Sequence, residues 1–287
     1  MLYLELLFQG LVQGSIYALI ALGLTLVYGL LRILHVAHAA LFTLGGYLGV
    51  IVTNASGSLP LAMLVAMVVV GFVGMAMYKL AYEPLLSKPP YISLIASIAL
   101  FIAAEEIFRI VFGPYGLSYE NPPLQGYFEI FDGFFLKYAE ALVIGLSVVM
   151  LSVLGWLSGH TRLGVSWRAT VTDPGMARAF GINTQRVRYL NFFIGSALAA
   201  SAGVLVALLN NLVEPTMGSV PSYKALAIIV LGGLGNIRGT LVAAMTIGVL
   251  ESFGTIYLGH LMDRDALAFG FLILVLMFRP QGLLGTK

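Results

Sequence analysis

Two histidines are the first side chains of this sequence whose type and spacing could support chemistry. His35 and His38 are three residues apart, so a helix would place both rings on one face. A zinc site needs three or four protein ligands, but His160 and His260 are distant in the sequence and the chain has no Cys. We therefore predict no metal site. We favour plain interfacial histidines, and keep a polar kink beside a transport path as the alternative.

Glu251 is a second candidate, because it lies within the apolar segment Val242–Leu258 without another charged residue. An ionisable side chain at membrane depth is costly and by default suggests a function. A buried carboxylate satisfied by backbone groups or a neighbouring helix is an equally good interpretation. Glu105 and Arg109 are four residues apart, and this spacing predicts a local ion pair.

Motifs of phosphate-binding and hydrolytic enzymes are absent from the sequence. It contains no G-x-x-x-x-G-K-[ST], no G-x-S-x-G and no H-E-x-x-H. The glycine cluster at residues 232–236 does not follow the G-x-G-x-x-G pattern, and we interpret it as a break between two apolar segments. We predict no catalytic residues and no directly bound cofactor.

The composition indicates the class of protein to which these residues belong. Of the 287 residues, 60% are hydrophobic and 10% are charged, whereas soluble domains contain about 25% charged residues. This excludes a water-soluble domain and a disordered chain. The formal net charge of +2 carries no signature of nucleic-acid binding. The chain is predicted to lie in a lipid bilayer.

The predicted fold is an all-α polytopic membrane protein, in which residues 1–287 form one transmembrane domain. A membrane-spanning helix needs roughly 20 apolar residues, and about nine segments (eight to ten) approach this length. Abundant Gly, Ala and Ser predict close helix packing. The segments are Leu11–Leu31 and residues 36–54, 60–80, 91–112, 138–158, 189–210, 222–234, 240–259 and 266–278, of which 222–234 and 266–278 are short enough to be half-spans.

The distribution of basic residues predicts the orientation of the chain. Arg32 directly follows the first segment, and residues 159–188 carry five arginines against one aspartate, a net charge of +4. Residues 113–136 carry three acidic residues and no Lys or Arg. Cytoplasmic loops are enriched in Lys and Arg. We therefore expect an external N-terminus, an extracytoplasmic loop at 113–136, a cytoplasmic loop at 159–188 and a cytoplasmic C-terminus.

The cytoplasmic loop contains the signals of a short, capped helix. Asp173 or Thr172 suits the N-cap and Pro174 the first helical position. Gly181 suits the left-handed residue that closes a helix. A helix over residues 174–180 is too short to be stable alone, so we expect it to dock on a partner or on the bundle. An ordinary loop would explain the arginines but not the caps. The apolar docking face would comprise Met176, Ala177 and Phe180.

Four stretches together resemble the permease subunits of branched-chain amino acid ABC importers. The segment Arg168–Ile182 resembles the coupling-helix region of that family. The other three are residues 14–24, residues 231–239 followed by Glu251, and residues 278–283. The match covers essentially the whole chain. One departure is His35-Val36-Ala37-His38-Ala39, where the family usually has Asn-x-Ala-His-Gly, and this leaves the substrate open.

The resemblance implies a type II-like importer fold with a transport path between two permease subunits. It also implies a second related permease (a heterodimer rather than a homodimer), two ATP-binding cassette ATPases and an extracytoplasmic binding protein. The location would be the bacterial cytoplasmic (inner) membrane. The residues implied in coupling to the ATPases are Arg168, Asp173, Pro174, Met176, Ala177, Arg178, Phe180, Gly181 and Ile182.

An inverted repeat is a further hypothesis. Segments one to four and six to nine would be related around segment five, so that the break at 32–40 corresponds to that at 210–222. Broken helices of this kind often form transport sites. The candidates for the transport path are His35, His38, Asn210, Pro215, Gly218 and Glu251.

Several alternatives for function stay open at this stage. Related importers carry branched-chain amino acids, other amino acids, or urea and short amides. A secondary transporter or channel without an ATPase is a rival, although such proteins usually have several intramembrane charges. A structural membrane subunit with no path of its own is another.

Overall fold

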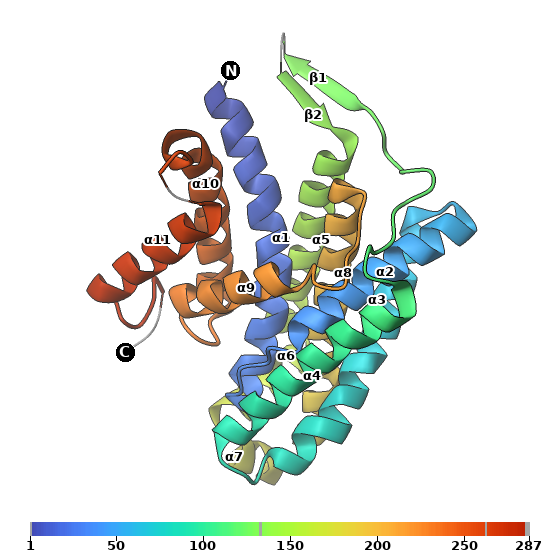
Figure 1. Cartoon of the computed structure of the whole chain (residues 1–287). Coiled ribbons are helices and arrows are strands. Elements are labelled where there is room, and N and C mark those ends of the chain that lie inside the picture. Colours follow the sequence, from blue (N-terminus) through green and yellow to red (C-terminus); the bar gives the residue numbers. More distant parts are fainter. Residues whose placement is uncertain (1, 132–133, 262, 285–287) are drawn as a thin grey trace.

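The computed structural model of the chain describes residues 2–131, 134–261 and 263–284. Eleven α-helices and one two-stranded hairpin are found in these ranges (Figure 1). The helices are α1 Leu2–Leu31, α2 His38–Ser56, α3 Leu59–Met77, α4 Pro90–Phe112, α5 Tyr138–His160, α6 Arg162–Thr172, α7 Pro174–Ala179, α8 Thr184–Asn210, α9 Ser219–Gly232, α10 Ile237–Leu258 and α11 Arg264–Phe278. A π-helical turn, Tyr78–Tyr82, and a 3-10 turn, Glu83–Leu85, extend α3.

A helix overlaps each of the nine predicted segments, and the six long apolar stretches among them make the chain a multi-pass membrane protein. Six helical stretches are long and apolar enough to cross a membrane: α1, α2, α3 with its extension to Leu85, α5, α8 and α10. Helix α9 is apolar but shorter, and α4 and α11 are not among the six. Helix α1 begins at Leu2, earlier than the predicted Leu11.

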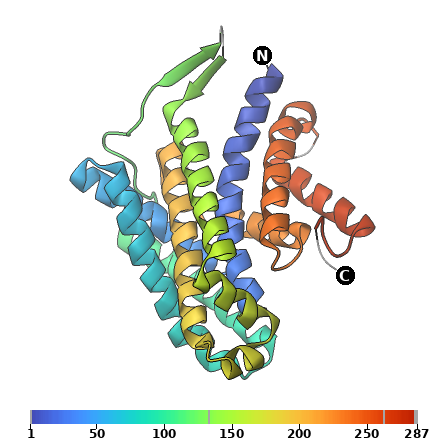
Figure 2. The ribbon, with the colours of Figure 1, turned by 180° about the vertical axis from the view of Figure 1, so that it is seen from behind.

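The long helices lie lengthwise beside one another. Figures 1 and 2 show α1, α5 and α8 running between two ends of the bundle, with α2, α3 and α4 on one side and α9, α10 and α11 on the other. The N-terminus and the hairpin lie at one end, called here the hairpin end. Helices α6 and α7 lie at the opposite end, called here the α7 end.

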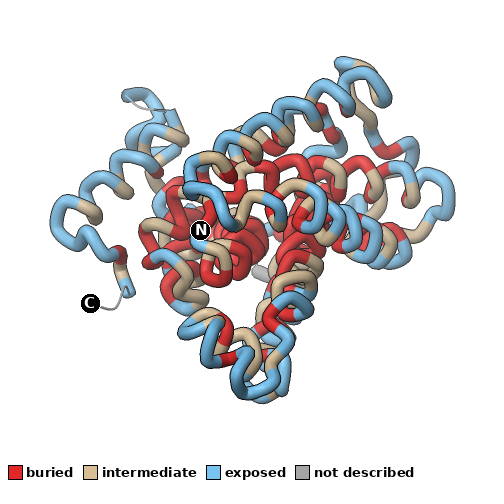
Figure 3. The backbone as a smooth tube through the Cα atoms, turned by 90° about the horizontal axis from the view of Figure 1, so that it is seen from below, coloured by how far each residue is buried: buried red, intermediate tan, exposed pale blue. Residues whose placement is uncertain are grey.

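The core of the bundle is built around α1. Buried residues concentrate on this helix and on α8, which packs against it. Figure 3 shows the buried residues gathered toward the middle of the bundle, with exposed residues around them. Glycines allow the close approach: a Cβ placed on Gly10 would lie 2.7 Å from the Cα of Val249, and one on Gly248 would lie 2.6 Å from the Cα of Gly14. Small residues permit such backbone contact in lipid, where packing rather than burial drives helix association.

Helices α1 and α8 cross in opposite directions, as the inverted-repeat hypothesis requires. Gly23 lies against Gly195, and one turn later along α1 the Leu26 carbonyl accepts a 2.6 Å hydrogen bond from the Asn191 amide, which is earlier in α8. Each helix is followed by a residue with positive φ, Arg32 (56°) and Asn211 (54°). In such a repeat α1 corresponds to α8 and α3 to α10. The packing agrees, because α10 packs on α1 and α3 packs on α8.

The segments between the helices depart from prediction in two places. Residues 113–136, predicted to be a loop, contain an antiparallel hairpin of β1 Tyr127–Phe131 and β2 Phe134–Lys137. Aromatic residues favour strands, and the Tyr127 and Phe135 rings meet edge to face at 5.0 Å. The segment 159–188 contains not only α7 but also α6, which was not predicted.

Candidate functional site

The short helix α7 has the caps that the sequence predicts. The Asp173 carboxylate accepts hydrogen bonds from the backbone nitrogens of Gly175 (2.8 Å) and Met176 (2.9 Å). Gly181 has a φ of 84° and follows the end of the helix. The Asn183 side chain then caps α8 through the backbone nitrogen of Arg186. These contacts fix α7 at both ends, because they satisfy backbone groups that a helix end leaves open.

Two apolar side chains of this segment project away from the protein. Met176 is 56% exposed and Phe180 is 80% exposed. Ala177 was predicted to share this face, but it is buried because its side of α7 faces the bundle. Arg178 bonds to the Pro174 carbonyl within α7. Pro174 and Ile182 are half-buried. Exposed apolar side chains at one point of a membrane protein outside its spans are suited to contact with another protein.

Arg168 connects α6 to α5. Its guanidinium donates a hydrogen bond to the Ser158 carbonyl near the end of α5. On the same side, Trp167 of α6 lines an apolar groove together with Leu26 of α1 and Leu190 of α8. Helix α6 therefore connects α7 mechanically to three long helices.

The two histidines are buried inside the bundle rather than exposed on its surface. His35 is 1% and His38 is 2% exposed. His35 Nδ1 shares a 2.6 Å hydrogen bond with the Tyr82 hydroxyl, which donates to Ser97 Oγ at 2.8 Å. His38 Nε2 lies 3.2 Å from the Ile20 carbonyl. The break after α1 returns to the interior of the bundle, which buries both rings. No group of three or more His, Cys, Asp or Glu side chains suited to a metal occurs within the described ranges.

The transport-path candidates predicted in the break at 210–222 lie in two different places. Pro215 and Gly218 are buried, and a Cβ on Gly218 would lie 2.5 Å from the Ala39 carbonyl oxygen at the start of α2. The starts of α2 and α9 therefore meet inside the bundle. Asn210, at the end of α8, is instead exposed to a cavity at the hairpin end. The structure does not gather the six path candidates into one site.

Glu251 has partners on three other helices. Its carboxylate lies 2.9 Å from Lys224 Nζ of α9 and 2.8 Å from Arg264 Nε of α11, and it accepts a 2.7 Å hydrogen bond from the Tyr17 hydroxyl of α1. Lys224 also lies 2.8 Å from Asp265. The two cations and two anions balance. The interpretation of Glu251 as a carboxylate satisfied by neighbouring helices is therefore supported by the geometry.

Sequence reasoning missed the charged partners of Glu251 in this cluster, among them Lys224 and Arg264. Lys224 lies within the predicted apolar segment 222–234, and the same signal that drew attention to Glu251 applies to it. Arg264 lies just before the predicted segment 266–278 and was not singled out. The predicted Glu105–Arg109 pair is also wrong: Arg109 pairs with Glu106 at 3.2 Å, while Glu105 accepts a hydrogen bond from Ser219 of α9.

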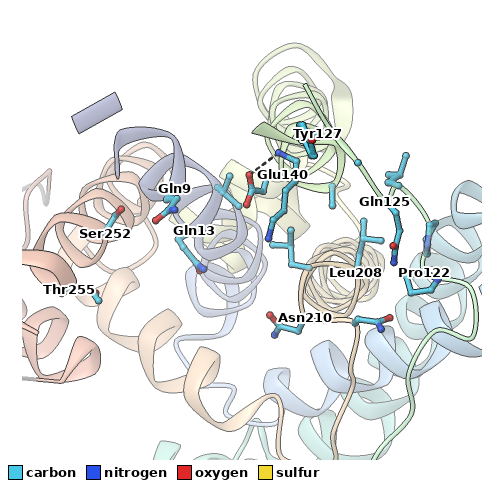
Figure 4. A pocket seen from close by; sticks show the side chains of 18 of the residues that line it. Gln9, Gln13, Pro122, Gln125, Tyr127, Glu140, Leu208, Asn210, Ser252 and Thr255 are labelled. Atoms are coloured by element: carbon cyan, nitrogen blue, oxygen red, sulfur yellow. Dashed lines mark hydrogen bonds between the residues drawn. The ribbon is translucent and has the colours of Figure 1, made fainter. Parts of the chain in front are cut away.

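A polar cavity of about 610 Å³ opens beside this cluster at the hairpin end. It lies between the ends of α1, α5, α8 and α10, and Figure 4 shows Gln9, Gln13, Glu140 and Asn210 around it. Arg264 belongs both to its wall and to the buried cluster. Its volume is in the range of about 300–1,000 Å³ that is common for small-molecule sites.

The fold and these sites define a class: a polytopic membrane protein with a glycine-packed helical bundle, a protruding capped helix and a polar cavity. Among solved structures, PsaBC from Streptococcus pneumoniae in complex with Fab has a similar fold, with a TM-score of 0.51 and 11% sequence identity over 95% of this chain and 91% of that chain. This likeness concerns the fold alone.

Sequence comparison is more specific. Residues 6–278 match the family described as the permease component of branched-chain amino acid transport systems. The chain is 33% identical to the permease protein BraD of Pseudomonas aeruginosa and 30% identical to LivH of Escherichia coli K12, in each case over 99% of this chain and 96% of the relative. LivM of the same Escherichia coli strain is 27% identical over 94% of this chain and 68% of LivM. All three are named as permease proteins of high-affinity branched-chain amino acid transport systems. The chain belongs to this permease family.

Proposed function

We propose that this chain is the membrane-spanning subunit of an ATP-driven importer of branched-chain amino acids in the bacterial cytoplasmic membrane. Membership of the permease family supports the transport role. The names of BraD and LivH support branched-chain amino acids rather than urea or short amides as the substrate. As a transport subunit, the chain itself would not hydrolyse ATP.

The same relatives support a second permease subunit in the proposed importer. LivH and LivM are two permeases of one organism, and both are similar to this chain. This supports a pairing with a second, related permease, with the transport path between the two. Two cytoplasmic ATPases and an extracytoplasmic binding protein complete the proposed importer. In this arrangement the binding protein sets most of the substrate specificity.

We propose that α7 contacts an ATPase subunit. This contact rests on the exposure of Met176 and Phe180 at a helix that is capped at both ends. We place the α7 end in the cytoplasm and the hairpin end outside, because basic residues are concentrated around α7. Nine membrane segments, of which α4, α9 and α11 would be tilted or partial, agree with this orientation.

The proposed mechanism uses the rigid connection of α7 to the bundle. ATP binding closes the two ATPases, and α7 moves with the ATPase surface that holds it. Helix α6 transmits this movement to α5 through Arg168 and to α1 and α8 through Trp167. Energy is coupled only if the ATPase surface binds α7 differently in its two states.

Reconstituted transport tests the proposal. The chain, its partner permease, the ATPases and the binding protein are placed in proteoliposomes, and uptake of labelled L-leucine is measured with and without internal ATP. ATP-dependent uptake of L-leucine but not of urea is expected. Uptake that persists without the ATPases would contradict the proposal and favour a secondary transporter.

Cross-linking tests the ATPase contact. Because the chain has no Cys, Phe180→Cys introduces its only thiol. A short thiol-to-amine cross-linker is expected to join this variant to an ATPase subunit. The matched variant Tyr115→Cys, which lies in the 113–136 segment, is expected to give no such product.

A further inference from the structure

The polar cavity at the hairpin end is lined by groups that suit a small polar ligand. Neutral carboxamides can both donate and accept hydrogen bonds, and several face this space. They come from α1, from the segment preceding the hairpin and from the end of α8, which are far apart in the sequence. The carboxamides are Gln9, Gln13, Gln125, Asn210 and Asn211.

Charged side chains of both signs complete the wall. Lys137 and Glu140 come from the start of α5, and Arg264 comes from the start of α11. Glu140 Oε2 accepts a 3.2 Å hydrogen bond from the Lys137 backbone nitrogen, and no other hydrogen bond to this carboxylate is found among the described residues. Throughout the described chain, Glu140 forms no ion pair with Lys137 or Arg264. The cavity therefore presents separate positive and negative groups.

Arg264 is held in place from behind the cavity. Its Nε lies 2.8 Å from Glu251, whose other oxygen is 2.9 Å from Lys224, and the arginine side chain is 37% exposed. The two terminal nitrogens of its guanidinium have no hydrogen-bond partner among the residues that the structure describes. A guanidinium fixed through Nε can offer those nitrogens to a carboxylate in a planar, charge-assisted contact.

Part of the wall is apolar. These side chains lie on α1, α5, α8 and α10, on the same helices as the polar groups. An aliphatic ligand group could lie against them and gain from leaving water. They are Val12, Ala139, Leu208, Leu209 and Ile256.

We infer that this cavity binds a zwitterionic aliphatic amino acid, with its carboxylate on Arg264 and Lys137 and its ammonium group on Glu140 and nearby carboxamide oxygens. An inorganic anion would leave Glu140 unpaired, and a neutral amide would leave both Lys137 and Glu140 unpaired, which is unfavourable in a partly dehydrated site. The inference rests on the proposed transport function and deepens it: the cavity would receive the substrate as the binding protein releases it.

Direct binding tests the inference separately from transport. The full-length chain is placed in lipid nanodiscs, and saturation-transfer difference NMR is recorded with L-leucine, L-leucinamide and 4-methylpentanoate. The last two lack the carboxylate and the ammonium group, respectively. L-leucine is expected to bind about ten-fold or more tightly than either, the usual effect of losing one charged hydrogen-bonding contact. Equal binding of all three would overturn the inference.

Variants locate the binding site. Glu140→Gln and Lys137→Gln do not touch the buried cluster, so they avoid the folding defect that Arg264→Gln could introduce. Each is expected to weaken L-leucine binding about ten-fold and to raise the KM for uptake while the maximal rate persists. The matched controls Glu106→Gln and Lys88→Gln, which lie outside the cavity, are expected to change neither quantity.

The two proposals fail in different ways. If the wild-type importer shows no ATP-driven uptake of L-leucine, the transport proposal is wrong, and the nanodisc measurement still decides whether the cavity binds the zwitterion. If uptake is ATP-driven but Glu140→Gln and Lys137→Gln leave both KM and binding unchanged, the cavity assignment is wrong and the transport function stands.

Discussion

Lys224 of α9 and Glu251 of α10 form an ion pair of 2.9 Å whose side chains are only 5% and 0% exposed. The pair is joined by Arg264 and Tyr17, so that the cluster ties α9, α10, α11 and α1 together. Breaking a buried pair by removing one partner typically costs about 3–5 kcal/mol, because it leaves an uncompensated charge. The cluster is therefore expected to govern stability as well as the orientation of Arg264.

Removing Glu251 is expected to be more damaging than removing Lys224. Glu251→Gln removes the buried carboxylate from both Arg264 and Lys224 and leaves Lys224 with the partly exposed Asp265, whereas Lys224→Met leaves the buried Glu251 paired with Arg264. We expect Glu251→Gln to lower the free energy of unfolding by about 3–5 kcal/mol and Lys224→Met by less. Thermal unfolding of the purified chain in detergent measures both.

The double variant is the control for this prediction. Lys224→Met combined with Glu251→Gln removes both charges of the pair, so its loss of stability is expected to be smaller than that of Glu251→Gln alone. Additive losses in the double variant would show that the two side chains do not act as a pair.

The close crossing of α1 and α10 should not tolerate a methyl group. A Cβ on Gly248 would meet the backbone of Gly14, which has no side chain to move aside. Gly248→Ala is expected to destabilise the bundle by about 1–3 kcal/mol or more and to reduce the amount of folded protein in the membrane. Size-exclusion chromatography in detergent measures the folded fraction.

Gly155→Ala is the matched substitution, since a Cβ at this position in α5 meets nothing within 4 Å. Alanine is favoured over glycine inside a helix by roughly 0.5–1 kcal/mol, so this variant should be as stable as the wild type or slightly more so. A similar loss in both variants would contradict the assignment of the crossing.

The caps of α7 are expected to control coupling rather than membrane insertion. Asp173→Ala or Asp173→Lys removes the acceptor for two backbone nitrogens and should cost the short helix about 0.5–2 kcal/mol. ATP-driven uptake should fall while the amount of protein in the membrane stays constant. Asp173→Ser restores a capping oxygen and should recover most of the uptake. Uptake by Asp173→Lys equal to that of the wild type would remove α7 from the mechanism.

Gly181 provides an independent test of the same element. Its φ of 84° suits glycine and, less well, asparagine, and a Cβ there meets no other atom. Gly181→Val should therefore impair uptake through backbone strain of about 1–2 kcal/mol, and Gly181→Pro should do the same. Gly181→Asn should remain active. Loss of uptake in the asparagine variant would point to a requirement other than backbone conformation.

The proposed orientation predicts opposite accessibility for the two ends of the bundle. In cells, a membrane-impermeant maleimide should label Tyr115→Cys from outside and should label Phe180→Cys only after permeabilisation. Both substitutions are at exposed positions and each creates the sole thiol of the chain. Labelling of Phe180→Cys in intact cells would reverse the orientation.

Local features could be read from the sequence because their causes are local. Asp173, Pro174 and Gly181 lie within nine residues of one another, and the capping contacts that they form span at most three residues. The apolar segments were recognised for a similar reason, since each helix satisfies its own backbone hydrogen bonds within the membrane. The aromatic residues at 127 and 135 favour a strand, but the apolar, helix-rich sequence around them led to the prediction of a loop.

Long-range features needed the tertiary structure. Tyr17 and Glu251 are 234 residues apart in the sequence and 2.7 Å apart in the bundle, and no periodicity connects them. His35 and His38 follow Arg32 closely, which suggests a membrane surface, yet the chain turns back after α1 and buries both rings.

The sequence by itself determined the membrane class, the helical segments, the capped helix α7 and the family, because composition, helix caps and motif order are properties of neighbouring residues. Only the tertiary structure decided that Glu251 is paired, that Gly23 of α1 lies against Gly195 of α8 and that Gln13, Glu140 and Asn210 line one cavity. The physical reason is that helix packing through small residues joins distant segments by shape, and a linear pattern does not specify which faces meet.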